Sequence, residues 1–76
     1  MLKVKVVAFG PLTDQLPREQ MVEVAPGATT RSLLSQLGLD AQAEHLKVAI
    51  DGAIVANDAA LIDGAEIMLL PPSSGG

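Results

Sequence analysis

The last six residues, PPSSGG at positions 71–76, are the part of the sequence whose residue types best suit a chemical step. Pro71 and Pro72 cannot donate a backbone hydrogen bond and favour an extended chain. Gly75 and Gly76 carry no side chain, so a terminal carboxylate there would have no steric shielding. We therefore expect the two prolines to form a stiff segment and the small residues after them to form a narrow one. Together they would place the α-carboxylate of Gly76 in a narrow site of another protein. The residues expected to thread that site are Pro71, Pro72, Ser73, Ser74 and Gly75.

Few other side chains could do chemistry. The sequence has no cysteine, so disulfides and thiolate metal sites are excluded, and His45 alone cannot hold a metal ion. Asp51 and Asp63 each precede a glycine, a pair typical of tight turns, and we interpret both as turn residues. Arg31 and Lys47 are interpreted as solvent-exposed, although either could meet an acidic patch on a partner. We predict no metal site, no bound cofactor and no catalytic side chain.

Composition restricts the class of partner. Five Lys and Arg against nine Asp and Glu give a net charge of −4, which argues against binding to a phosphate backbone. Phe9 is the only aromatic residue, which argues against a base-stacking surface. No apolar run is long enough to span a membrane, and the first ten residues lack the pattern of a signal peptide. We therefore expect a cytoplasmic protein with neither nucleic acid nor membrane among its partners.

The elements that must position the tail begin with a predicted hairpin. Leu2 to Phe9 alternates as a strand, with Leu2, Val4, Val6 and Ala8 on one face. The following GPLTDQLP is broken by glycine and proline and indicates a loop that could hold a helical turn. Gln20 to Ala25 is rich in β-forming residues, and we expect it to pair with the first strand while Val22 and Val24 face inward.

One helix is predicted in PGATTRSLLSQLG. Thr29 or Thr30 supplies the N-cap, because a threonine oxygen can accept from a free N–H of the first turn. The spacing of Leu33, Leu34 and Leu37 gives one buried stripe, and Gly38 stands where a left-handed residue ends a helix. So short a helix needs a sheet to pack on.

The second half of the chain supplies more strands. We expect strands at Leu46 to Ile50, at Ala53 to Val55 after the Asp51-Gly52 turn, and at Ala65 to Leu70, with Leu61 filling the core. The order β-β-α-β-(β)-β is typical of an α+β fold, the β-grasp, in which one main helix lies across a mixed sheet of four or five strands. The last strand is expected to be central and parallel to the first. Residues 1–70 would form the domain and residues 71–76 a flexible tail.

Four apolar residues fall on the strand face opposite the predicted core. They are Val7, Phe9, Met68 and Leu70. Two interpretations remain open for them. They either complete a core under a loop or form an apolar docking face for a partner, as an exposed apolar patch usually does.

Three stretches of the chain resemble the ubiquitin-like sulfur carriers of the MoaD/ThiS type, and most closely the small subunit of molybdopterin synthase. They are VVAFGPLTDQL, VAPGATTRSLLSQL and VAIDGAIVANDAALIDGAEIMLLPPSSGG. The paired prolines, two small residues and terminal Gly-Gly are typical of the molybdopterin branch. In one departure, Thr13 and Asp14 stand where the family's loop often carries a basic residue.

The resemblance implies a mechanism in which this chain is a co-substrate. An activating enzyme of the E1-like adenylyltransferase kind would use ATP to adenylate the Gly76 carboxylate. A persulfide sulfur from a sulfur donor would then displace AMP and leave a thiocarboxylate. The charged carrier would dock on the large subunit of molybdopterin synthase, in a heterotetramer of two small and two large subunits, and donate sulfur to precursor Z. The catalytic groups would lie in the partners.

Other functions fit the same sequence. A carrier for thiamine or cysteine biosynthesis resembles this chain in fold and in its Gly-Gly end. A ubiquitin-like protein modifier that forms isopeptide bonds to lysine has the same kind of tail. The third alternative is an interaction module whose tail is incidental, since short Ser/Gly ends also occur as frayed termini.

Overall fold

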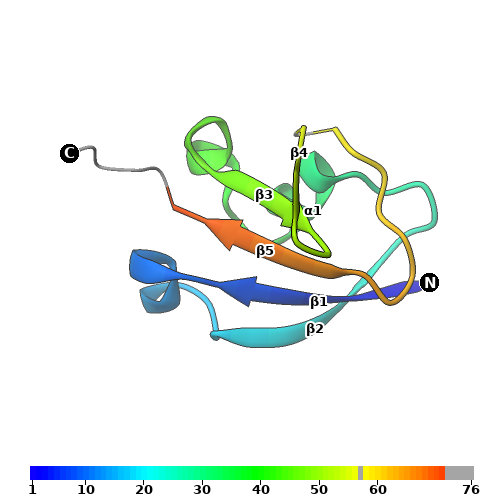
Figure 1. Ribbon diagram of the computed structural model, residues 1–76, viewed down its shortest axis with the longest axis horizontal. Helices are drawn as coiled ribbons and strands as arrows, with labels where there is room; N and C mark the ends of the chain where they lie inside the picture. The colour runs from blue at the N-terminus through cyan, green and yellow to red at the C-terminus, as the bar shows by residue number, and fades with distance from the viewer. Residues whose placement is uncertain (57, 72–76) are drawn as a thin grey trace.

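The computed structural model describes residues 1–56 and 58–71, without the side chains of 42–44, and shows one mixed sheet with one α-helix (Figure 1). The strands are β1 (Leu2–Ala8), β2 (Glu19–Val24), β3 (Lys47–Ile50), β4 (Ala53–Val55) and β5 (Glu66–Leu70), and the helix is α1 (Thr30–Gln36). Two 3₁₀ helices, η1 (Gly10–Asp14) and η2 (Asp40–His45), complete the described elements. The predicted order of strands and helix is confirmed, and the fold is the β-grasp.

The sheet order is β2-β1-β5-β3-β4, which places β5 at the centre. β5 runs parallel to β1, with Val6 opposite Ile67, and antiparallel to β3, with Ala49 opposite Met68. The remaining pairs, β1 with β2 and β3 with β4, are antiparallel hairpins. The prediction of a central last strand parallel to the first is therefore confirmed.

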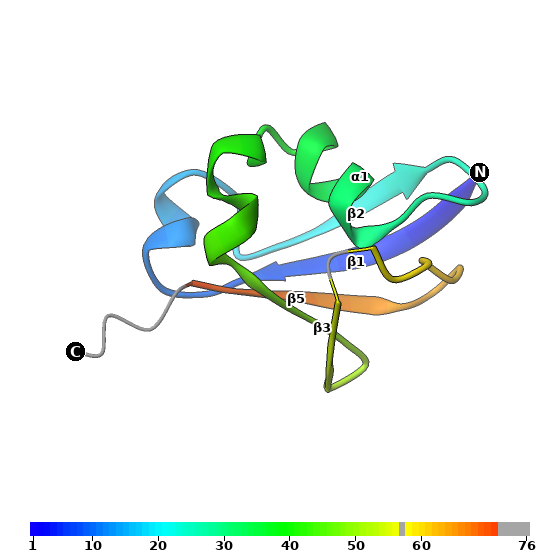
Figure 2. The same ribbon diagram turned by 90° about the horizontal axis from the view of Figure 1, so that it is seen from above.

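The core lies between the sheet and α1. Val4, Val6 and Ala8 of β1 and Ile67 and Leu69 of β5 are at most 1% exposed, as strand alternation predicts. Leu33 and Leu34 of α1 meet them from the other side, and Leu61 from the β4–β5 connection is also buried. Figure 2 shows α1 and η2 on one side of the sheet and no helix on the other. One sheet face is thus left open.

The N-cap of α1 is Thr29, one of the two threonines predicted for this position. Its side chain accepts from the Ser32 N–H, and the Ser32 hydroxyl oxygen accepts from the Thr29 N–H, which completes a capping box. Thr30 is instead buried, and its hydroxyl donates to the Ala56 carbonyl oxygen at 3.0 Å. The start of the helix is thereby tied to the chain that follows β4.

Both Asp-Gly pairs form turns, as predicted, and both aspartates also accept a backbone hydrogen bond. Asp51 has a φ of 50°, and its carboxylate accepts from the Glu66 N–H at 3.0 Å. The Asp63 carboxylate accepts from the Lys3 N–H at 2.8 Å. These bonds join each turn to a neighbouring strand.

The structure differs from the sequence prediction mainly at η2. The helical turns of Asp40–His45 were not predicted, because the segment lacks the capping and turn residues that would have indicated them. Buried Leu39 and Leu46 flank the segment and hold it on the core. Strand ends also move by one residue, so that Phe9 and Leu46 lie just outside β1 and β3. None of the described helices has the length and apolar composition that crossing a membrane requires.

Candidate functional site

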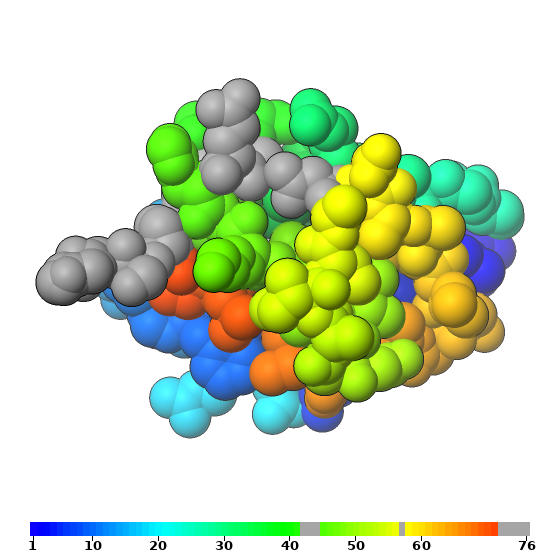
Figure 3. Space-filling view, turned by 45° about the horizontal axis from the view of Figure 1, so that its top comes forward, coloured from blue at the N-terminus to red at the C-terminus, as the bar shows by residue number. Residues whose placement is uncertain are grey.

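The open face of the sheet carries an apolar row that crosses four strands. Strand register places Val7 beside Met68, Met68 beside Ala49, and Ala49 beside Ile54. Figure 3 shows β5, in orange, reaching the surface between β1 in blue and the β3–β4 hairpin in green and yellow. No helix or loop covers this row in the part of the chain that the structure describes, although the small side chain of Ala49 is itself only 3% exposed.

The four apolar residues predicted for this face lie outside the buried core. Val7, Met68 and Leu70 are half-buried, and Phe9 is 38% exposed. Register places Leu70 at the same end of the face as Phe9, where β1 and β5 both end. Among the described residues no loop covers these four side chains, and their role in docking stays a prediction.

Sequence reasoning missed Ala49 and Ile54. Ile54 is 61% exposed and extends the apolar row onto the edge strand. The signal was present, because a two-residue Asp51-Gly52 turn sets Ile50 opposite Ala53 and hence Ala49 opposite Ile54. Strand alternation then puts both on the face of Met68.

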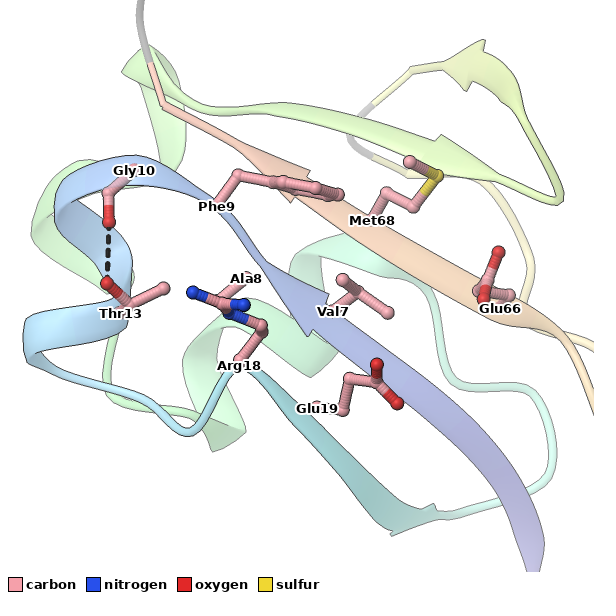
Figure 4. Close-up of a pocket in the computed structure, with 9 residues that line it drawn as sticks. All are labelled: Val7, Ala8, Phe9, Gly10, Thr13, Arg18, Glu19, Glu66 and Met68. Atoms are coloured by element: carbon pink, nitrogen blue, oxygen red, sulfur yellow. Dashed lines mark hydrogen bonds between the residues drawn. The ribbon is translucent and has the colours of Figure 1, made fainter.

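A hollow of about 530 Å³ lies at the end of the open face where β1 and β5 finish (Figure 4). It is lined by the end of β1, by η1, by the start of β2 and by β5. The lining residues are Val7, Ala8, Phe9, Gly10, Thr13, Arg18, Glu19, Glu66 and Met68. The Thr13 hydroxyl donates to the Gly10 carbonyl oxygen at 2.8 Å, which stiffens the η1 wall.

Acidic side chains of the hollow are paired with Lys5. The Lys5 ammonium lies 3.1 Å from a Glu19 carboxylate oxygen and 3.8 Å from one of Glu66. The hydrogen bond and charge of Glu19 raise the pKa of Lys5, with a smaller contribution from Glu66. Lys5 is therefore fully protonated at neutral pH and offsets much of the negative charge at this side.

The first residue of the tail, Pro71, lies directly after β5 and against η1. A Cβ atom added to Gly10 would stand 3.2 Å from Cγ of Pro71. Gly10 also has a φ of 58°, which favours glycine. Gly10 thus allows a close approach that sets where the tail leaves the domain. The other predicted tail residues, Pro72, Ser73, Ser74, Gly75 and Gly76, lie outside the described residues.

Replacing Gly10 by alanine is expected to destabilise the fold and to displace Pro71. A left-handed alanine costs about 1–2 kcal/mol, which lowers the Tm by roughly 4–8 °C per kcal/mol in a domain of this size. Gly38→Ala is the matched control, because Gly38 has a φ of 79° and nothing within 4 Å of an added Cβ. Thermal denaturation should show losses in both variants, whereas NMR should show shifted Pro71 side-chain resonances in Gly10→Ala alone. Unchanged Pro71 resonances would contradict the contact.

The remaining residues considered from sequence lie away from the hollow. His45 is exposed at the end of η2, and Arg31 is exposed on α1, on the other side of the sheet. Lys47 is exposed on the open face, opposite Leu70. Within the described residues, no group of three or more His, Asp or Glu side chains could hold a metal ion.

Comparison with known proteins gives a family match over most of the chain. The family model for ThiS matches residues 6–76. No curated protein matches the chain. Among solved structures, the chain is similar to SAMP1 from Haloferax volcanii, with 26% identity, a TM-score of 0.76, and coverage of 97% of this chain and 99% of that one.

Two further structures are named for molybdopterin conversion. A protein from Pyrococcus furiosus described as "putative molybdopterin converting factor, subunit 1" has 23% identity and a TM-score of 0.80, covering 95% of this chain and 99% of its own. A chain in the complex of subunits 1 and 2 of molybdopterin-converting factor from Helicobacter pylori 26695 has 26% identity and a TM-score of 0.68. That match covers 99% of this chain and 100% of the other. The predicted β-grasp is thus of the ubiquitin-like kind.

Proposed function

Because this chain belongs to the ThiS family of ubiquitin-like sulfur carriers, we propose that it is the sulfur-carrying small subunit of a molybdopterin synthase. The observation that carries the proposal is the family match, which extends through residue 76 and so includes the Gly-Gly end. Two of the similar structures are named as molybdopterin converting factor. The paired prolines of the tail agree with the same branch.

In the proposed reaction, the reacting group is the α-carboxylate of Gly76. Its oxygen attacks the α-phosphorus of ATP in an E1-like activating enzyme, and pyrophosphate leaves. The terminal sulfur of a persulfide on a donor protein then attacks the acyl carbon, and AMP leaves. A thiol cleaves the resulting acyl disulfide, so that the carrier keeps one sulfur as a thiocarboxylate and the thiol forms a new disulfide with the donor. Adenylation is needed because a carboxylate oxygen is a poor leaving group.

The fold supplies delivery and docking for this chemistry. Pro71 lies at the end of the central strand, against Gly10, so the tail begins from a fixed point. Five residues beyond Pro71 reach about 17 Å when extended, enough to enter a deep site while the domain stays outside. The hollow lies at the same end of the sheet as the tail, and the open apolar row begins beside it at Val7 and Met68. We propose that this face docks on the large subunit, as one carrier-like chain is paired with a second subunit in the Helicobacter pylori complex.

Mass spectrometry tests the proposed function. The purified protein is incubated with the activating enzyme of its own organism, ATP, a persulfide donor and a thiol. The expected product has the mass change of one oxygen replaced by one sulfur, and the same mixture without ATP should leave the mass unchanged. An unmodified mass in the complete mixture would overturn the proposal.

A second candidate function, protein modification, is favoured by the likeness to SAMP1, a small archaeal modifier protein. In that case the adenylated Gly76 would be passed to a lysine amine, with an isopeptide bond formed and AMP lost. The distinguishing observation is a series of higher-mass conjugates that carry the tagged chain in a cell extract. Conjugates without any thiocarboxylate would favour the modifier over the carrier.

A further inference from the structure

We propose that Arg18 binds a carboxylate on the rim of the large-subunit site that receives the tail. The inference rests on the proposed function, because the partner that would fill the hollow is the large subunit into which the tail is inserted. It assigns to Arg18 a role in selecting that partner.

The backbone of Arg18 is held at the end of the sheet from which the tail leaves. Arg18 directly precedes β2, and its carbonyl oxygen accepts from the Ala8 N–H at 2.9 Å, so its backbone is held against the end of β1. Its side chain is exposed and lines the hollow together with Phe9 and Thr13. Figure 4 shows the guanidinium directed toward Thr13, below Phe9, while the Glu19 side chain points away from it.

The hollow contains both acidic and basic side chains. Glu19 and Glu66 are both within 4 Å of Lys5, and these are the two ion pairs among the side chains that the structure describes. Arg18 therefore has no carboxylate partner within the described part of the chain, although its neighbour Glu19 has one. In the lining of the hollow, Glu19 and Glu66 are therefore paired with Lys5, whereas Arg18 has no ion pair within the described residues. Arg18 lies at the end of the sheet from which the tail leaves.

A second cation, Lys47, lies at the same end of the sheet. Lys47 is exposed on the open face opposite Leu70, and it also makes no ion pair within the described residues. Arg18 and Lys47 thus lie on either side of the strand ends that carry Phe9 and Leu70. The protein as a whole has a net charge of −4, so two cations without an ion pair differ from the acidic average of the chain.

The unpaired Arg18 and the apolar side chains beside it indicate which group of the large subunit would fill the hollow. A guanidinium beside apolar side chains binds a carboxylate through two parallel, charge-assisted hydrogen bonds, which become stronger as water is excluded. An aspartate or glutamate with an apolar neighbour would satisfy Arg18 and fill the space over Val7 and Met68. A basic side chain of a partner at this position would face the Arg18 guanidinium. The repulsion between the two cations would weaken binding and so exclude partners of the wrong charge.

The test measures binding of the full-length protein to the large subunit of its own organism by isothermal titration calorimetry. Arg18→Glu should weaken binding about tenfold or more, and Arg18→Lys should weaken it less, because the charge stays but the paired hydrogen bonds are lost. Lys47→Ala should give a smaller loss. Arg31→Glu is the matched control, since it makes the same charge change on the helix side of the sheet, and it should leave the Kd within about twofold.

The outcomes separate this proposal from the proposed function. Equal effects of Arg18→Glu and Arg31→Glu would overturn the role of Arg18 while leaving the carrier function in place. Tighter binding by Arg18→Glu would show a basic partner group and would also overturn it. Wild-type protein that acquires a thiocarboxylate but binds no large subunit would overturn both the docking of Arg18 and the synthase assignment.

Discussion

Deletion of Gly75 and Gly76 is expected to abolish thiocarboxylate formation while the Tm stays within about 1 °C of wild type. The reason is that the proposed reaction takes place on the carboxylate of Gly76, whereas every buried apolar residue in the described chain lies at or before Leu69. The loss should be complete, because the new terminus is Ser74 and its carboxylate would stop two residues short of the reaction centre. Mass spectrometry after incubation with the activating enzyme, ATP and the sulfur donor measures the first quantity, and thermal denaturation the second.

A variant with one residue added after Gly76 tests whether the position of the terminal carboxylate matters when all native residues are present. Adding one tryptophan after Gly76 keeps every native residue but moves the carboxylate outward and gives it a bulky neighbour. This variant should also form no thiocarboxylate. Ser73→Ala with Ser74→Ala is the matched control, because it keeps the tail length and its small residues, and it should react at nearly the wild-type rate. Full activity of the tryptophan variant would show that the chemistry does not occur at Gly76.

Much of the fold could be predicted because local signals agreed with one another. Asp51-Gly52 requires a left-handed turn, and the two alternating segments around it could pair in only one register. The spacing of Leu33 and Leu34 after a threonine cap fixed one helix and its buried side. The almost continuous apolar run of β5 is typical of a strand with a neighbour on each side, and the sheet order places it at the centre.

The features that were missed depend on contacts distant in sequence. The η2 segment has no strong propensity of its own and is held by buried Leu39 and Leu46, which no local pattern reveals. The contact of Gly10 with Pro71 joins residues that only the parallel pairing of β1 and β5 brings together. The same holds for the hollow, whose walls come from four separate elements. The sequence indicated which residues face outward on β1 and β5, but not that Arg18 would stand beside them.

Replacing Met68 by lysine is expected to weaken binding to the large subunit by about 2–4 kcal/mol, the range of a central interface residue. Met68 lies in the middle of the apolar row, between Val7 and Ala49, so docking would have to bury the new ammonium among apolar side chains. The fold should survive, since Met68 faces away from the core and a lysine can direct its charge into water while the protein is free. Calorimetric titration against the large subunit measures the loss. Ile62→Lys is the matched control, because Ile62 is 68% exposed but lies in the β4–β5 connection and not on a strand of the sheet. A Kd for Met68→Lys equal to that of Ile62→Lys would mean that the partner reaches the tail without touching the sheet, so that the tail alone would have to supply the binding energy.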